Sequence, residues 1–264
     1  MRWSETVQSY IQALKPIPLN QAVMRRLFSL IDLTSLHSND TEASIADLCK
    51  KAETALGHVA AVCVFPTFVS IVANQFADTS IKTATVVNFP QGNDTLDAVL
   101  VEMNTALQNG AQEIDMVLPY SRYLAGEREA VRTFVTACKA ACGEKVLLKV
   151  ILETGALPNL TTIANASEDA LLAGADFIKT STGKITKGAN LEAVATMLLV
   201  VKRMTPQLNR TVGVKASGGI SHVQQAVQYI ALADHIMGNH WVSPATFRIG
   251  ASKLVDEINT ISLC

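Results

Sequence analysis

Four ionisable side chains lie inside, or at the carboxyl end of, apolar runs that are typical of buried β-strands. They are Asp115, Lys149, Lys179 and Lys215. Strands disfavour aspartate and lysine, and both are rarely buried completely. Four such residues in one chain therefore indicate a shared polar centre, in which aspartate is available for proton transfer and lysine for nucleophilic attack.

The spacing of Lys179 and Lys215 suits a lysine nucleophile. They are 36 residues apart, the length of one strand–helix unit, so we expect neighbouring strands with both amino groups at one mouth. Two charges about 5–6 Å apart repel by roughly 3 kcal/mol at an effective dielectric near 20, and burial adds to the effect. We therefore expect a lowered pKa for Lys179, whose neutral amine can attack a carbonyl and form an imine. Asp115, two strands earlier, is the expected proton carrier.

Three glycine-containing loops follow predicted strands and are suited to phosphate binding. Glycine lets backbone N–H groups approach an anion, and a helix N-terminus adds a favourable dipole. In β/α barrels such sites gather at the last loops. The Thr-Gly-Lys triplet is not a Walker motif, because no glycine stands five residues before Gly183. Beside two lysines, these loops favour a phosphorylated substrate; they are Thr180–Lys184, Ala216–Gly219 and Gly250–Ser252.

Short β-rich runs alternate with longer helical patterns along most of the chain. Apolar runs without alternation suit parallel strands that are buried on both faces. Eight strand–helix units predict an α/β fold, a single (β/α)8 TIM barrel with extra N-terminal helices. The competing open, doubly-wound sheet usually carries a G-x-G-x-x-G motif, which the sequence lacks. The expected strands are Ala60–Val64, Thr83–Val87, Glu113–Leu118, Val146–Leu152, Phe177–Lys179, Val212–Lys215, His235–Met237 and Arg248–Ile249.

One domain is expected over residues 1–264, with a helical N-terminal cover at 1–57 and the barrel at 58–264. The formal net charge of −1 argues against nucleic-acid binding. No apolar stretch approaches the roughly 20 residues of a membrane span. The N-terminus shows no secretory signal, and the five cysteines have neither disulfide nor metal-site spacing. We therefore expect a cytoplasmic protein without a membrane partner.

The residues around Lys179, Lys215 and Asp115 together resemble the 2-deoxyribose-5-phosphate aldolase family. The resemblance runs from about Leu30 to Leu254. The segment around Lys179 is highly specific, and with the one around Lys215 it leaves little room for another aldolase. The segments that carry the resemblance are Ile31–Thr34, Ala61–Pro66, Val87–Gly92, Glu113–Val117, Leu148–Gly155, Ala175–Lys184, Val212–Gly219 and Arg248–Ser252.

The resemblance implies a class I aldolase, a carbon–carbon lyase that reversibly cleaves 2-deoxy-D-ribose 5-phosphate to D-glyceraldehyde 3-phosphate and acetaldehyde without metal or cofactor. It implies that Lys179 forms the imine, that Lys215 keeps Lys179 neutral and joins the proton relay, and that Asp115 takes a substrate proton through a water. Members commonly form homodimers or homotetramers. Phosphate-binding positions are matched by Gly183, Gly218, Gly219 and Ser252, and positions around the sugar hydroxyls by Asp32, Thr182 and Lys184.

The chain departs from the family pattern at two places. Some members end in a flexible tail whose tyrosine assists proton transfer at the enamine. This sequence ends Ile261-Ser-Leu-Cys264, so we expect that step to be slower or mediated by water. Lys253 stands where close relatives have a second serine; it either adds charge to the phosphate site or points to solvent.

Several alternatives stay open. A zinc-dependent aldolase would need histidine ligands, and the five histidines show no ligand spacing. A pyridoxal-phosphate barrel would also use a strand lysine and a phosphate cup. A non-catalytic sugar-phosphate-binding barrel and a Schiff-base aldolase for another phosphorylated sugar are further candidates. Lys149 is either a catalytic group or a structural partner of a carboxylate such as Glu153 or Asp115.

Overall fold

The structure, a computed structural model, describes the backbone of residues 3–262 and the side chains of residues 3–261. Met1 and Arg2 lie outside the described residues. They belong to the N-terminal segment in which no secretory signal is expected. So do Leu263 and Cys264, which include one of the five cysteines and the end of the sequence that lacks the family's tyrosine.

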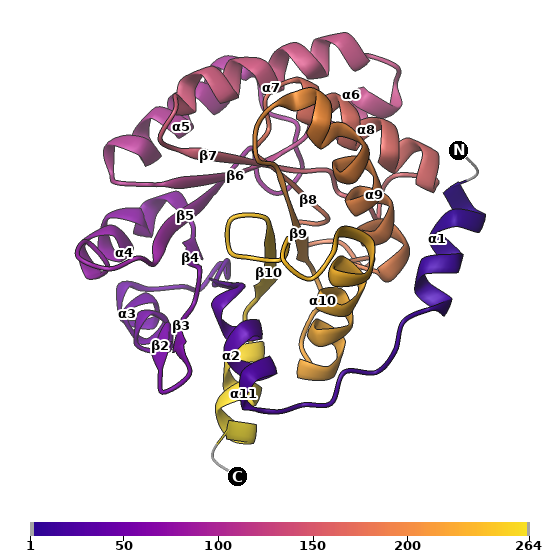
Figure 1. Cartoon of the computed structure of the whole chain (residues 1–264). Helices are drawn as coiled ribbons and strands as arrows, with labels where there is room; N and C mark the ends of the chain where they lie inside the picture. The colour runs from indigo at the N-terminus through magenta and orange to yellow at the C-terminus, as the bar shows by residue number, and fades with distance from the viewer. Residues whose placement is uncertain (1–2, 263–264) are drawn as a thin grey trace.

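Eight parallel strands form a closed ring in the order β1-β10-β9-β8-β7-β6-β5-β4, and β1 pairs with β4 to close it. Helices surround the ring (Figure 1). The structure therefore confirms the predicted (β/α)8 barrel. The strands are β1 (Ile31–Thr34), β4 (Ala61–Val64), β5 (Lys82–Val87), β6 (Glu113–Val117), β7 (Leu147–Ile151), β8 (Phe177–Lys179), β9 (Gly213–Ser217) and β10 (Phe247–Ala251).

The helices pack on the outside of the barrel through one apolar face, as amphipathic helices do. Their starts are often capped: the Asn190 side chain accepts a hydrogen bond from the N–H of Ala193 at the start of α9 (2.8 Å). The helices are α1 (Trp3–Gln12), α2 (Gln21–Ser29), α3 (Glu42–Lys50), η1 (Pro66–Phe68), α4 (Val69–Gln75), α5 (Leu96–Gln108), α6 (Tyr120–Leu124), α7 (Arg128–Cys142), α8 (Leu160–Leu172), α9 (Leu191–Leu208), α10 (Val223–Met237) and α11 (Leu254–Ser262).

The N-terminal region differs from the expected helical cover at 1–57, because it contains β1, a strand of the barrel. It also contains α3 and one strand of a small antiparallel sheet, β2 (Glu53–Thr54) with β3 (Gly57–His58). The helix α1 packs against α9, and α2 packs beside α10 and α11 (Figure 1). Only α1 and α2 therefore precede the barrel in the described part of the chain.

The strand expected at His235–Met237 is wrong, because these residues form the last turn of α10. The helix ends where Gly238 takes a φ of 95°, a left-handed conformation that glycine adopts readily. The other seven expected strands overlap strands of the barrel. The eighth strand is therefore β1, which follows α2 after a single residue and is only four residues long.

The interior of the barrel divides into an apolar part and a charged part. A small cluster of Leu36, Ala61, Cys63, Ala84 and Val86 is buried around β4 and β5. The larger core cluster extends through the rest of the molecule.

None of the helices in the described part of the chain has the length and apolar character that a membrane crossing needs.

Candidate active site

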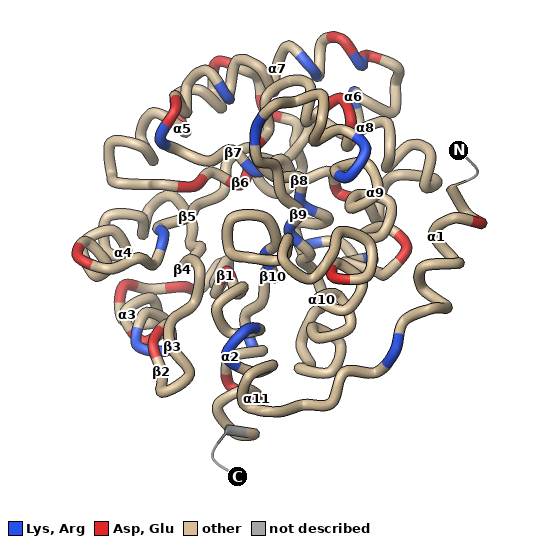
Figure 2. Tube along the Cα trace, in the orientation of Figure 1, with Lys and Arg blue, Asp and Glu red and all other residues tan. Residues whose placement is uncertain are grey.

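The registers of neighbouring strands place the two predicted lysines side by side. Lys179 on β8 is the direct partner of Lys215 on β9, as their spacing predicts. On the other side of β8, Asp115 on β6 is the partner of Lys149 on β7. Because successive residues of a strand point to opposite faces, these four side chains all enter the barrel interior. Figure 2 shows charged residues on the central strands, inside the ring of helices.

Asp115 accepts hydrogen bonds from three lysines. Its Oδ2 lies 2.8 Å from Nζ of Lys179 and 2.7 Å from Nζ of Lys215, and its Oδ1 lies 2.8 Å from Nζ of Lys149. All four side chains are buried. One oxygen of the carboxylate therefore holds Lys179 and Lys215 close to each other, and the other oxygen binds Lys149.

A second ion-pair layer, of which the sequence predicted only Asp32 as a site residue, adjoins the first. Arg248 on β10 donates to Oδ1 of Asp32 (2.6 Å) and to Oε1 of Glu113 (2.9 Å). Lys149 links the layers, since its Nζ is 2.6 Å from Glu113 and 3.5 Å from Asp32. Lys215 is 2.6 Å from Asp32. These contacts make Lys149 a structural partner of carboxylates on β1 and β6.

The charges of this buried cluster balance only if one lysine is neutral. The cluster has three carboxylates, Asp32, Glu113 and Asp115, and four basic groups. An uncompensated charge is costly to bury. Burial lowers the pKa of Lys179, Lys215 lowers it further, and Asp115 only partly opposes them. Lys179 is therefore the group that gives up its proton most readily.

The pKa shifts of Lys215, Lys149 and Asp115 favour their charged forms. Burial acts against the charged form of Lys215, but Asp115 and Asp32 outweigh it and raise the pKa of Lys215. Carboxylates likewise raise the pKa of Lys149. Burial alone would raise the pKa of Asp115, yet the three lysines hold that pKa well below its usual range. The predicted direction for Lys179 is confirmed, although burial is a larger cause than repulsion by Lys215.

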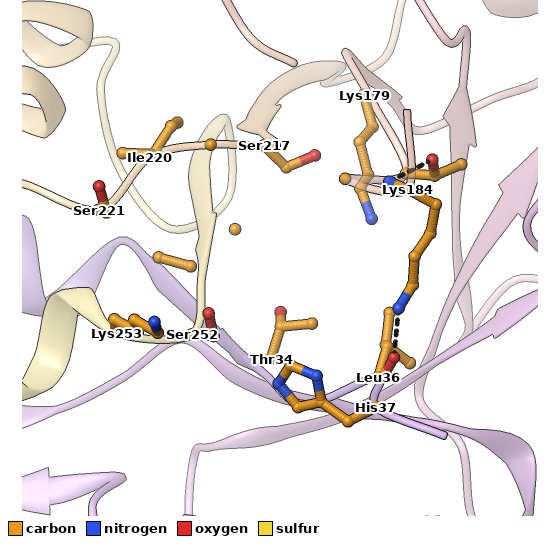
Figure 3. A pocket seen from close by; sticks show the side chains of 16 residues that line it. Thr34, Leu36, His37, Lys179, Lys184, Ser217, Ile220, Ser221, Ser252 and Lys253 are labelled. Carbon is orange, nitrogen blue, oxygen red and sulfur yellow. Dashed lines mark hydrogen bonds between the residues drawn. The ribbon is translucent and has the colours of Figure 1, made fainter. Parts of the chain in front are cut away.

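A cavity at the carboxyl ends of the strands reaches Lys179 (Figure 3). In the close-up, its side chain points into the cavity opposite Thr34, and Lys184 flanks it with its Nζ bonded to the carbonyl of Leu36. Seven predicted site residues line this cavity: Lys179, Thr182, Gly183, Lys184, Gly218, Gly219 and Ser252. Asp32, Asp115 and Lys215 do not line it and lie in the buried cluster beneath.

Two glycine-containing loops, those after β8 and β9, pack against each other beside the cavity. Gly218 has a φ of 93°, and a Cβ there would lie 3.0 Å from the Cβ of Ser181 and 3.1 Å from the Cα of Gly188. The carbonyl of Gly218 accepts a hydrogen bond from Ala189 (3.0 Å). The loops therefore need glycine for both conformation and space. Backbone N–H groups of such loops form anion-binding concavities.

Thr34 and His37 line the cavity and had no part in the sequence-based site. Two more lining residues had no assigned role: Ser217, from the predicted loop Ala216–Gly219, and Lys253, which Figure 3 shows next to Ser252. Ser217 was predictable, since it lies two residues beyond Lys215 and shares its face of the strand. In the described part of the chain, no group of three or more His, Cys, Asp or Glu side chains is arranged to hold a metal ion.

Comparisons with known proteins identify the family of the chain. The model of the DeoC/LacD family aldolases matches residues 26–243. Deoxyribose-phosphate aldolase of Agrobacterium fabrum (strain C58 / ATCC 33970) is 45% identical over 231 residues, which cover 87% of this chain and 88% of the relative.

Solved structures are also similar. A provisionally assigned deoxyribose-phosphate aldolase from Toxoplasma gondii ME49 superposes with a TM-score of 0.82 at 28% identity, over 91% of this chain and 95% of the other. The tetrameric deoxyribose phosphate aldolase from Aeropyrum pernix gives 0.72 at 28% identity, over 93% and 99%. The chain belongs to the DeoC/LacD family of aldolases.

Proposed function

We propose that this protein is a Schiff-base aldolase that reversibly cleaves 2-deoxy-D-ribose 5-phosphate to D-glyceraldehyde 3-phosphate and acetaldehyde. One observation carries the proposal. Of the three lysines bound to Asp115, Lys179 alone lines the cavity, and it is the one whose pKa is lowered. A neutral amine that is exposed only to a cavity is the arrangement that imine formation needs.

In the proposed reaction the Lys179 amine attacks the aldehyde carbon of the open-chain sugar and loses water to form an imine. The protonated imine accepts the electron pair of the bond between the second and third carbons of the sugar, which breaks and leaves a two-carbon enamine. The hydroxyl on the departing carbon loses its proton and becomes the aldehyde of the first product. Protonation of the enamine carbon and hydrolysis of the imine then release acetaldehyde and restore Lys179.

Asp115 is proposed to accept the hydroxyl proton through a water. Its strongly lowered pKa keeps it a carboxylate near neutral pH, so it is available to accept a proton and has none to donate. Lys215 is proposed to anchor Asp115 and to disfavour a charge on Lys179, which the 2.7 Å contact with Asp115 supports. Asp32 is proposed to act through Lys215, because its carboxylate lies 2.6 Å from that lysine and does not line the cavity.

The phosphate of the substrate is proposed to bind at the end of the cavity formed by Gly183, Gly218, Gly219 and Ser252. The three glycines have φ values of 76°, 93° and 78°, which give their N–H groups directions that other residues rarely adopt. Lys253 lines the same end, which supports added charge for the phosphate over a solvent-only role. Thr182 and Lys184, which flank Gly183 in the loop after β8, also line the cavity and are proposed to contact the sugar hydroxyls.

Two further properties are proposed from the family. The Aeropyrum pernix relative is a tetramer, and we expect this chain to form a homodimer or homotetramer. We expect it to work in the cytoplasm, because four of its cysteines are free and buried, as is usual in a reducing compartment.

The test is turnover of 2-deoxyribose 5-phosphate together with borohydride trapping of the imine and peptide mass mapping. We expect cleavage that resists a strong chelator, and an adduct on Lys179. Lys179→Leu should abolish both turnover and trapping, whereas Lys50→Leu, at an exposed position on α3, should change neither. Turnover by Lys179→Leu, or an adduct on another lysine, would refute the proposal.

A further inference from the structure

Glu153 is a buried carboxyl group next to the proposed active site that the reaction above does not use. It lies two residues after the end of β7, and its side chain has no exposed surface. Its Oε2 accepts hydrogen bonds from the hydroxyl of Thr182 (2.5 Å) and from the Thr182 N–H (3.3 Å). Its Oε1 is buried and has no hydrogen-bond partner in the structure. A buried polar atom without a partner is rare and points to a functional requirement.

Glu153 differs from the other buried carboxylates because it has no ion pair. Among the described residues, the buried carboxyl groups are Asp32, Glu113, Asp115, Glu153 and Asp169. Each of the other four is paired with lysine or arginine. A carboxyl group buried without a cation favours its protonated form. Glu153 is thus the member of this set that is suited to carry a proton in and out.

The backbone of Glu153 is held in an unfavourable conformation. Its φ is 53°, in the left-handed region that residues with a side chain seldom occupy. The neighbouring residues are fixed by strand bonds, from Leu152 N–H to the carbonyl of Lys179 (2.9 Å) and from Thr154 N–H to that of Thr180 (2.8 Å). The turn between them directs the carboxyl group toward Thr182. Strain that persists between fixed neighbours is common at functional sites.

Thr182 connects Glu153 with the cavity. It lines the same cavity as Lys179, and its hydroxyl also accepts a hydrogen bond from the N–H of Lys184 (3.0 Å). We propose that Glu153 is the proton reservoir for the enamine carbon, acting through the hydroxyl of Thr182. This inference rests on the proposed aldolase function and adds the source of one of its protons. Glu153 does not touch the substrate.

The proposed step balances as follows. Protonated Glu153 donates its proton to the Thr182 oxygen, and the Thr182 hydroxyl proton passes to the terminal carbon of the enamine. The carbon–carbon double bond supplies the electron pair of the new C–H bond, the nitrogen lone pair forms the iminium double bond, and Glu153 becomes a carboxylate. The reverse sequence removes a proton from the imine of acetaldehyde.

The groups around Glu153 agree with this exchange. Burial raises the pKa of Glu153, and the hydrogen bonds of Thr182 and the charge of Lys179 only partly offset it. Tyr120, at the start of α6, is near enough that a negative charge on Glu153 adds to the effect of burial in raising the pKa of the phenol. Asp115 cannot replace Glu153 as a donor, because three lysines keep it a carboxylate.

The step can be isolated with acetaldehyde alone. In D2O the intact enzyme should replace the methyl protons of acetaldehyde by deuterium. Each time the enamine forms and is protonated again, its carbon receives a deuteron from the solvent. NMR follows this exchange. Glu153→Gln keeps the size of the side chain and an acceptor for Thr182 but cannot carry a proton. We expect exchange to fall by about 100-fold, a usual effect of losing a positioned acid–base group. Borohydride trapping of acetaldehyde on Lys179 should be unchanged.

The matched control is Asp169→Asn, which alters another buried carboxylate, bonded to Tyr123 (2.6 Å) and Arg128 (2.9 Å). In this variant the rate of proton exchange, divided by the amount of Lys179 that borohydride traps, should be the same as in the wild-type protein. Normal exchange by a Glu153→Gln variant that still traps acetaldehyde overturns this proposal alone. Failure of the wild-type protein to trap acetaldehyde on Lys179 overturns the proposed function instead.

A wild-type measurement covers the case in which Glu153→Gln does not fold. In protein labelled with ¹³C at the glutamate carboxyl, one resonance should titrate with a midpoint above the usual value of about 4.3. The same resonance should shift when acetaldehyde is added. If no glutamate resonance does both, Glu153 is not the reservoir.

Discussion

Lys179, Lys149 and Lys215 share one carboxylate, yet they differ in what else they contact. Lys149 and Lys215 have no exposed surface and are also bound to carboxylates other than Asp115. Lys179 has Asp115 as its only carboxylate partner in the described structure and opens to the cavity. A second carboxylate stabilises the charged form of a buried amine. The difference between nucleophile and structural lysine therefore lies in the number of acidic neighbours.

At the scale of elements, the loops after β8 and β9 form one unit. A Cβ on Gly188 would lie only 2.2 Å from the carbonyl oxygen of Gly218, closer than any packing allows. The position of the phosphate-facing loop after β9 therefore depends on a residue of the loop after β8. This dependence explains why the two loops carry glycine at facing positions.

Gly188→Ala should displace the Gly218 loop and weaken binding of the phosphate. We expect a KM for 2-deoxyribose 5-phosphate at least about 10-fold higher, the equivalent of 1.4 kcal/mol or more of lost binding. Trapping of acetaldehyde, which has no phosphate, should be unchanged. The control is Gly126→Ala, which strains the backbone at a φ of 92° but brings an added Cβ within 4 Å of no neighbour, so it costs stability without moving the Gly218 loop. An unaltered KM in Gly188→Ala would show that the loops move independently.

Sequence patterns predicted most elements because buried parallel strands form uninterrupted apolar runs. The predictions failed where a short apolar run fitted a helix as well as a strand, or where a charged residue interrupted the run of a strand. His235–Met237 is as apolar as a short strand, but it continues the amphipathic pattern of α10 up to Gly238. Ile31–Thr34 is a strand whose run is broken by Asp32, which turns inward to meet Arg248 at 2.6 Å. This ion pair with the neighbouring strand β10 compensates the buried charge of Asp32, and no local pattern contains it.

The site was predictable to the extent that spacing along the chain determines it. The separation of Lys179 and Lys215 implied adjacent strands, and the register confirms it. Glu113 and Arg248 were missed because a charge near the end of a short strand usually reaches solvent. Glu153 was missed as a site residue because its direction depends on a left-handed backbone at one position.

At the scale of the whole molecule, the buried ion pairs connect strands on opposite sides of the barrel. Arg248 on β10 reaches Glu113 on β6, and Lys149 on β7 reaches Asp32 on β1. A barrel interior is normally filled by bulky apolar side chains. Here charged groups fill part of it, so the same contacts that position Lys179 also hold the barrel closed.

Arg248→Ala should therefore destabilise the protein strongly. The substitution removes the guanidinium group that lies 2.6 Å from Asp32 and 2.9 Å from Glu113. Breaking a buried ion pair costs about 3–5 kcal/mol. Arg122→Ala removes a surface pair with Glu127 (2.9 Å) and should cost less than about 1 kcal/mol. Denaturant unfolding measures both. Equal losses in the two variants would mean that the buried cluster adds no stability.

The most direct test of the account is the protonation of Lys179 itself. The rate at which acetaldehyde forms a borohydride-trappable imine on Lys179 should follow the fraction of neutral amine, so it falls as the pH drops through the pKa of that lysine. Because burial and Lys215 lower this pKa, we predict a midpoint below the usual lysine value of about 10.4. A midpoint at or above that value would contradict the account.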